Sequence, residues 1–290
     1  MRVGLHALGI GTGARPEVIR AVAAAADTAG FATLWSGEHV VLVDRPASRY
    51  PYSADGRIGV PAGADWLDPL LGLSFAAAVT SRITVATGVL LLPEHNPVLV
   101  AKQAATLDVL SSGRLTLGIG IGWSAEEFAA LGVPFARRGQ RAAEYVAAMR
   151  RLWSEDVASF HGEFASFEAI RVNPKPVRGR QIPIVVGGNS DAALTRVAAF
   201  GDGWYGFNLT AAEAAERIAA LAGHCQQQGR SLNELSVAVA LTDADPALVP
   251  DLARAGLTEL VLVAAPPPDP AEATTWLTDL ANRWSLPARP

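Results

Sequence analysis

The sequence predicts a (β/α)8 TIM barrel, an α/β fold in which eight parallel strands alternate with eight helices. Eight short apolar runs of strand-like composition alternate with eight alanine-rich stretches whose apolar residues recur at helical spacing. Half of the 290 residues are hydrophobic and only 18% are charged, so the chain can bury a large core. Eight such units in this length fit one barrel better than an open sheet with a second lobe. We therefore expect a single TIM-barrel domain over residues 1–290.

Each expected strand is a short apolar run between turn residues. These runs are Val3–Leu8, Ala32–Trp35, Ile83–Leu91, Arg114–Ile121, Ile182–Val186, Gly203–Phe207, Leu235–Leu241 and Thr258–Val263. The expected helices are Pro16–Gly30, Pro69–Thr80, Pro97–Leu110, Arg137–Trp153, Asp191–Phe200, Ala211–Gln228, Pro246–Ala255 and Pro270–Trp284. Several of these helices begin at proline, which suits the first turn because an N–H group there has no helical partner.

Two stretches interrupt the alternation. Residues Val40–Asp68, rich in proline and glycine, predict a long loop after the second strand, on the face where barrels keep their sites. The loop carries Tyr50, Tyr52 and Trp66, which either line a substrate pocket or only pack the loop onto the barrel. Residues Val157–Gln181 predict a small hairpin inserted before the fifth strand, with a structural role.

Composition excludes several classes of protein. A single cysteine, Cys225, cannot form a disulfide within the chain, which favours a reducing, cytoplasmic setting. The net charge of -4 has no long basic run, so we expect no nucleic-acid or membrane partner. The first residues lack the apolar region of a signal peptide, and no apolar stretch is long enough to cross a bilayer. We therefore expect a small molecule as the partner.

Glycines repeat at the end of the fourth expected strand, in Gly118-Ile-Gly120-Ile-Gly122-Trp123. These glycines remove side chains from the mouth of the barrel. Either a flat ring lies against the bare backbone or the turn packs tightly on the next helix, and both interpretations remain open. Ser124 then predicts the N-cap of a short helix, with Glu127 at the capping-box position.

The fifth expected strand ends in Gly187-Gly188-Asn189-Ser190 and leads directly into a helix. The first N–H groups of a helix have no partner within it, and its dipole is positive at that end. Phosphate binding by Gly187, Gly188 and Asn189 is therefore preferred over a plain turn.

His39 directly follows the second expected strand and stands beside the carboxylate of Glu38. A histidine in that place can move a proton near neutral pH. His6 lies inside the first strand, as a core residue or as part of the barrel floor. We expect no chemical role for the other three histidines, which are His95, His161 and His224. No pair of histidines or cysteines has the spacing of zinc ligands, so no metal site is predicted.

Four segments carry motifs that occur together in one family. They are Trp35-Ser-Gly-Glu-His39, Thr87-Gly-Val-Leu-Leu-Leu-Pro-Glu-His-Asn-Pro97 continued to Asp108, Ser112-Gly-Arg-Leu-Thr-Leu-Gly-Ile-Gly-Ile-Gly-Trp123, and Ile184-Val-Val-Gly-Gly188 with Gly201-Asp-Gly-Trp204. Each segment is weak alone, but the combination resembles the bacterial luciferase-like monooxygenase superfamily, and within it the F420-dependent oxidoreductase branch.

The resemblance implies a cofactor ring at the mouth of the barrel, with its phosphate-bearing tail near Gly187 and Gly188. Family members have a non-prolyl cis peptide bulging from the third strand behind the ring, and the matching bond is Gly88-Val89. In the F420 branch an acidic residue and a histidine after the second strand meet the cofactor and the substrate. Glu38 and His39 correspond to them, so His39 is the expected catalytic proton donor or acceptor. The residues expected to bind the cofactor are Glu38, Gly88, Val89, Gly120, Gly122, Trp123, Gly187, Gly188 and Asn189.

The sequence departs from the family pattern at two positions. The F420-dependent sugar-phosphate dehydrogenases carry a glutamate where Trp123 stands, so neither that acid nor sugar-phosphate oxidation is transferred to this chain. Luciferase places an arginine for the flavin phosphate at the position of Ile121. The substitution weakens the case for FMN as the cofactor.

These observations predict an F420-dependent oxidoreductase that transfers a hydride between the deazaflavin and a small hydrophobic organic substrate. One alternative is a two-component FMN monooxygenase on the same barrel, and another is a barrel that binds the cofactor without turnover. The resemblance also implies a homodimer.

Overall fold

Eight parallel strands close into a barrel in the computed structural model, which describes residues 1–288. The strands are β1 (Arg2–His6), β2 (Thr33–Ser36), β3 (Thr84–Thr87) with its continuation β4 (Leu90–Leu91), β5 (Leu115–Gly120), β8 (Ile184–Gly187), β9 (Gly203–Leu209), β10 (Ser236–Leu241) and β11 (Glu259–Val263). Pairing of β1 with β11 and of β3 with β5 closes the ring. The predicted TIM barrel is confirmed.

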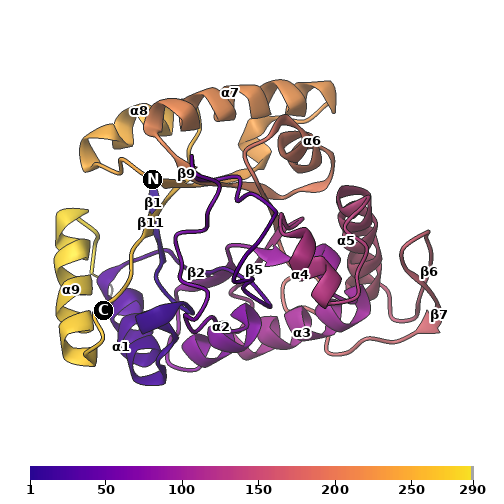
Figure 1. Ribbon diagram of the computed structural model, residues 1–290, viewed down its shortest axis with the longest axis horizontal. Helices are drawn as coiled ribbons and strands as arrows, with labels where there is room; N and C mark the ends of the chain where they lie inside the picture. The colour runs from indigo at the N-terminus through magenta and orange to yellow at the C-terminus, as the bar shows by residue number, and fades with distance from the viewer. Residues whose placement is uncertain (289–290) are drawn as a thin grey trace.

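Helices surround the strands (Figure 1). They are α1 (Pro16–Ala29), α2 (Pro69–Ala77), α3 (Pro97–Leu110), α5 (Arg138–Ser154), α6 (Asp191–Phe200), α7 (Ala211–Gln227), α8 (Val249–Ala255) and α9 (Pro270–Arg283). A short extra helix, α4 (Ala125–Ala130), follows β5 and is capped by the Ser124 hydroxyl, as predicted. The helix expected from Pro246 is shorter, because residues Pro246–Leu248 form a 3-10 turn and α8 begins only at Val249.

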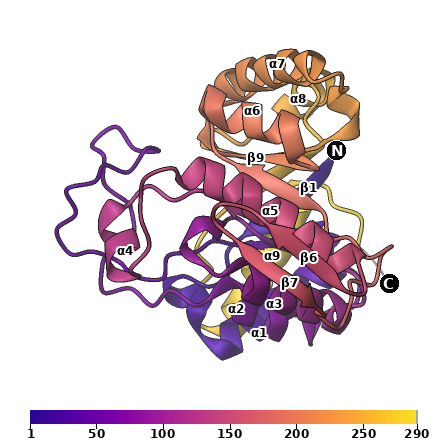
Figure 2. The same cartoon turned by 90° about the vertical axis from the view of Figure 1, so that its right-hand side faces the viewer.

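Both predicted insertions are present. The hairpin consists of β6 (Ala158–His161) paired antiparallel with β7 (Ser166–Ile170). The loop of residues 40–68 projects beside α4 and is drawn in indigo and violet at the left of Figure 2. No helix in residues 1–288 is long and apolar enough to cross a membrane.

The third strand is interrupted where the family resemblance implies a cis peptide. The Gly88-Val89 bond is cis, and it separates β3 from β4. This prediction is confirmed.

The barrel interior holds a small cluster of buried side chains that all come from strands. Trp35, Tyr205 and Val261 belong to this cluster, and the ring centroids of Trp35 and Tyr205 lie 4.7 Å apart. Below them the buried Glu259 carboxylate accepts a hydrogen bond of 2.8 Å from Trp35 Nε1 and pairs with Arg2 at 3.1 Å. Burial raises the pKa of Glu259, while Arg2 and the hydrogen bond from Trp35 act against that rise. The lower end of the barrel is thus filled, and open space remains at the opposite end.

Asp27 ties α1 to the turn before β3. Its buried carboxylate accepts hydrogen bonds from the backbone N–H groups of Ser81, Arg82 and Ile83 at 2.8, 3.0 and 2.6 Å. The Ser81 hydroxyl donates a further bond of 3.2 Å. Burial acts to raise the pKa of Asp27, but these hydrogen bonds outweigh it and lower the pKa below its ordinary value. The carboxylate therefore fixes the entry of the third strand.

Asp27→Ala should lower the free energy of unfolding by about 2–4 kcal/mol, since three backbone N–H groups lose their partner. Urea denaturation measures the change. Asp279→Ala, at an exposed position of α9, is the matched control and should change the free energy of unfolding by less than about 0.5 kcal/mol. An Asp27→Ala protein as stable as this control would show that Asp27 does not stabilise the turn before β3.

Candidate active site

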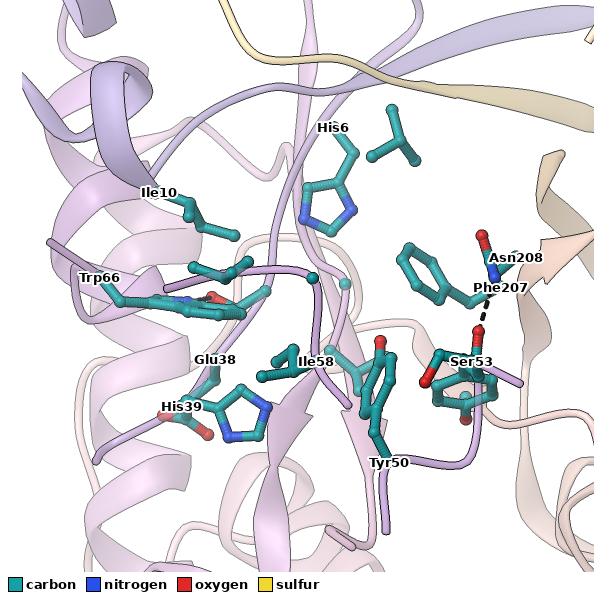
Figure 3. A pocket seen from close by; sticks show the side chains of 18 of the residues that line it. His6, Ile10, Glu38, His39, Tyr50, Ser53, Ile58, Trp66, Phe207 and Asn208 are labelled. Atoms are coloured by element: carbon teal, nitrogen blue, oxygen red, sulfur yellow. Dashed lines mark hydrogen bonds between the residues drawn. The ribbon is translucent and has the colours of Figure 1, made fainter. Parts of the chain in front are cut away.

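A cavity of about 860 Å³ opens at the carboxyl ends of the barrel strands (Figure 3). Its base is formed by residues at or just after strand ends, among them His6, Gly37, Gly88 and Gly187. Its remaining wall comes largely from the loop of residues 40–68. TIM-barrel enzymes place their active sites at this end, so the cavity is the candidate active site.

Aromatic side chains form much of the wall. The ring centroid of Tyr50 lies 5.4 Å from that of Tyr52 and 5.3 Å from that of Trp123, both edge-on. Trp66 donates a hydrogen bond of 3.0 Å from Nε1 to the carbonyl oxygen of Gly37. These rings line the cavity and also pack the loop onto the barrel.

His39 is held on both sides of its ring. Its Nδ1 lies 2.7 Å from Glu127 Oε2, and Trp123 Nε1 donates to its Nε2 at 3.3 Å. Glu127 Oε1 accepts the backbone N–H groups of Val40 and Val41 at 2.7 and 3.2 Å. Glu127 thus stands at the predicted capping-box position, but its side chain turns away from its own helix toward residues 39–41.

The hydrogen bonds define the protonation of His39. A carboxylate can only accept a hydrogen bond, and an indole N–H can only donate one. The imidazole must therefore carry its proton on Nδ1, facing Glu127, and present an unprotonated Nε2 to Trp123 and the cavity. A histidine held in this form is a proton acceptor at Nε2.

Glu38 is buried, and its carboxylate is engaged by neighbours. It accepts the Leu91 N–H at 2.6 Å and lies 3.0 Å from His95 Nε2. Burial acts to lower the pKa of His95, but the hydrogen bond and charge of Glu38 outweigh it and raise that pKa. His95, for which no chemical role is expected, thus pairs with the acid expected to meet the cofactor.

Glu94 is a buried acid that the sequence interpretation missed. Neither of its carboxyl oxygens has a hydrogen-bond partner among residues 1–288. Burial, together with the charges of Glu127 and Glu38, raises the pKa of Glu94 to about 9. The side chain is therefore neutral at physiological pH. Its position in a turn after the third strand gave no signal, since the three acids meet only in the folded barrel.

Three residues expected to bind a cofactor lie outside the cavity lining. A side chain at Gly120 would come within 2.6 Å of Val89, and one at Gly122 within 2.6 Å of Phe128. Both glycines thus serve tight packing, the second of the two interpretations of this motif. The Asn189 side chain accepts the Phe207 N–H at 3.2 Å and donates to the Phe207 carbonyl at 2.8 Å. Its amide is therefore committed to β9 and not directed toward a ligand.

The other expected residues are brought together. Glu38, His39, Gly88, Val89, Trp123, Gly187 and Gly188 all line the cavity. His6 also lines it, as part of the barrel floor, and its Nδ1 lies 2.9 Å from the hydroxyl oxygen of the buried Tyr205. Burial lowers the pKa of His6 to about 4 and raises the pKa of Tyr205.

A family model described as luciferase-like monooxygenase matches residues 3–280. The chain belongs to the luciferase-like monooxygenase family. Proteins of this family are oxidoreductases or monooxygenases.

Two curated relatives of this luciferase-like chain match part of it. An uncharacterised protein of Mycobacterium tuberculosis (strain ATCC 25618 / H37Rv) is 39% identical over 185 residues, which cover 63% of this chain and 65% of the relative. The FMNH2-dependent dimethylsulfone monooxygenase of Pseudomonas putida is 34% identical over 155 residues, which cover 52% of this chain and 42% of the relative. The chain therefore covers less than two thirds of the length of these relatives.

Among solved structures, the coenzyme F420-dependent tetrahydromethanopterin reductase of Methanopyrus kandleri is similar over almost the whole chain. The TM-score is 0.73, and the match covers 96% of this chain and 97% of the reductase at 16% identity. At this identity the similarity shows a shared fold.

Glu94→Gln should make the luciferase-like protein more stable than the wild type, and the difference in the free energy of unfolding should grow as the pH rises. The folded state keeps the Glu94 proton up to a pKa of about 9, whereas the unfolded chain releases it near the ordinary value of 4.5. Stability is therefore lost progressively as the pH rises through this window, and glutamine cannot ionise. Melting temperatures between pH 5 and pH 8 measure this difference, with Glu272→Gln at an exposed position of α9 as control. If the melting temperatures of the wild type and Glu94→Gln change with pH in the same way, Glu94 is not held neutral.

Proposed function

We propose that the protein is an F420-dependent oxidoreductase that transfers a hydride between the deazaflavin and a small hydrophobic organic substrate. The observation that carries this proposal is His39, which is held by Glu127 and Trp123 with its Nε2 unprotonated at the cavity wall. When bound, F420 supplies or accepts the hydride. The protein then has to bind and orient the cofactor and the substrate, and to move a proton.

The residues present fit a flat ring with an anionic tail. Gly37 and Gly88 line the cavity base and present backbone without side chains there. Gly187 and Gly188 line the cavity just before the start of α6. The guanidinium of Arg196, on α6, has a buried Nε without a partner in the described part of the chain. The Gly188 N–H already donates to the Tyr205 carbonyl oxygen at 3.3 Å, so Gly188 offers close approach of its backbone and no free N–H. We assign Gly187 and Gly188 to the phosphate of the tail, with Arg196, which lies outside the cavity lining, as its nearby cation.

The proton moves at Nε2 of His39. In the oxidising direction the substrate hydroxyl replaces Trp123 as the donor to Nε2, and its proton passes to the imidazole as the hydride leaves the adjacent carbon. The Glu127 carboxylate, 2.7 Å from Nδ1, stabilises the imidazolium that forms. In the reducing direction the same proton returns to the substrate oxygen. The aromatic wall favours a substrate that is small and apolar.

An FMN-dependent two-component monooxygenase is the second candidate. The similarity to an FMNH2-dependent monooxygenase at 34% identity favours it. The position of Ile121, where luciferase carries an arginine for the flavin phosphate, weighs against it.

Fluorescence titration of the purified protein with F420 and with FMN separates the two candidates. We expect micromolar binding of F420, followed by hydride transfer with at least one member of a panel of small ketones and secondary alcohols. Binding of FMN without binding of F420 would overturn the proposal. His39→Ala should bind F420 normally and lose turnover, whereas unchanged turnover would show that His39 is not the proton carrier. A wild-type protein that binds F420 and turns over no member of the panel would favour a barrel that only binds the cofactor.

Glu127→Gln should reverse the protonation of the His39 ring. The glutamine oxygen can still accept the N–H groups of Val40 and Val41, so its NH2 group faces Nδ1 and requires an acceptor there. Nitrogen-15 NMR of labelled histidine should show the proton on Nδ1 in the wild type and on Nε2 in the variant. The long bond of 3.3 Å from Trp123 Nε1 to Nε2 is then lost, because both groups are donors. Turnover should fall about 100-fold, while the Kd for F420 changes less than about threefold.

Glu126→Gln is the matched control for this variant. Glu126 lies on the same helix and accepts the N–H groups of Ala47 and Ser48, but it does not contact His39. It should leave the His39 proton on Nδ1. A Glu127→Gln protein that also keeps the proton on Nδ1 would refute the role of Glu127.

A further inference from the structure

His6 and Tyr205 form a second polar pair, at the floor of the cavity and separate from His39. His6 ends β1, Tyr205 lies within β9, and both side chains line the cavity. Figure 3 shows the His6 ring pointing into the open space. We propose that this pair is a hydrogen-bond donor site for the carbonyl oxygen of a neutral ligand.

The His6–Tyr205 pair has one hydrogen-bond donor more than the contact between the two side chains uses. A neutral imidazole carries one N–H and a phenol one O–H, and the contact between Nδ1 and the hydroxyl uses only one of them. If Tyr205 donates to Nδ1, the proton of His6 is on Nε2. If His6 donates from Nδ1, the Tyr205 hydroxyl proton remains free. Neither Nε2 nor the hydroxyl has any other partner within residues 1–288, so one donor is always available to a ligand.

The donor is neutral, which restricts the ligand. Burial keeps both members uncharged, since it lowers the pKa of His6 to about 4 and raises the pKa of Tyr205. A neutral donor next to the rings of Phe207 and Trp35 can satisfy a ketone, amide or imide oxygen. It cannot offset the cost of taking a carboxylate or phosphate out of water. The site therefore selects an uncharged carbonyl group.

The surrounding residues hold the pair and keep it uncovered. Trp35 packs on the Tyr205 ring and is itself held by the Glu259 carboxylate below. Above, Gly37 has no side chain, and a Cβ there would stand 3.4 Å from His6 Nε2. A larger residue at position 37 would cover the nitrogen that the site presents.

The carbonyl can come from two sources, a ring imide of the cofactor or an organic substrate. The inference depends on the proposed function only in that both use this cavity. It can therefore be tested without turnover and without F420.

The test follows the His6 nitrogens by NMR in the full chain labelled with nitrogen-15 histidine, with His6→Phe used for assignment. The probes are riboflavin for the ring, cyclohexanone for a neutral carbonyl, and cyclohexanecarboxylate as a charged analogue of similar size. We expect riboflavin or cyclohexanone to shift the His6 resonances and cyclohexanecarboxylate to leave them in place. A shift with riboflavin assigns the donor to the ring, and a shift with cyclohexanone assigns it to the substrate.

A double variant supplies an independent measurement. His6→Phe combined with Tyr205→Phe replaces both polar partners with apolar groups of similar shape, a change that stability tolerates better than loss of one partner. The Kd of the probe that shifts His6 should rise about tenfold, as expected for the loss of one neutral hydrogen bond. Tyr145→Phe removes a buried hydroxyl outside the cavity lining and should leave the Kd unchanged.

The inference is overturned if neither neutral probe shifts His6, or if cyclohexanecarboxylate shifts it as strongly as cyclohexanone. Unchanged binding in a folded double variant also overturns it, and the NMR result in the wild type decides if that variant does not fold. If F420 binds but no probe shifts the His6 resonances, this inference fails and the proposed cofactor stands. If cyclohexanone shifts the His6 resonances but F420 does not bind, the proposed cofactor is wrong and this inference stands.

Discussion

The buried carboxylate of Glu127 is the constraint on which the active-site end of the barrel depends. Its side chain is only 1% exposed, and it contacts three consecutive residues that follow β2, namely His39, Val40 and Val41. A buried charge is tolerated when hydrogen bonds replace the water it has lost. The same bonds fix the ring of His39 and the first residues of the loop that walls the cavity. Glu127 therefore positions both His39, the proposed proton carrier, and the start of the loop that forms the cavity wall.

The barrel was predictable because its signals are local. Alternation of strand-like and helix-like periods needs only neighbouring residues, and prolines and serines mark helix starts directly, as Ser124 does. The cis peptide at Gly88 and the positions of Glu38 and His39 followed from motifs that the chain shares with its family.

The contacts between distant segments were not predictable. Glu127 has a local capping signal, yet its side chain binds residues 86 to 88 positions earlier in the chain. His95 and Glu94 sit in an ordinary turn, and only the folded barrel brings them to Glu38. Gly120 and Gly122 have the pattern of a ring-binding surface, but Val89 and Phe128 occupy the space that their missing side chains leave. Sequence periodicity carries no information about such pairings.

The bonds between α4 and the loop have a consequence for how members of such a family diverge. Glu126 holds Ala47 and Ser48, the Ser48 hydroxyl in turn accepts the Ala125 N–H, and Glu127 holds the loop entrance. A loop transplanted alone from a homologue would leave these two carboxylates facing foreign backbone, one of them deep in the protein. Residues 77 to 87 positions apart in the sequence thus form one structural unit. A functional graft at this barrel mouth therefore has to carry the loop and α4 together, or to change only side chains that leave these bonds in place.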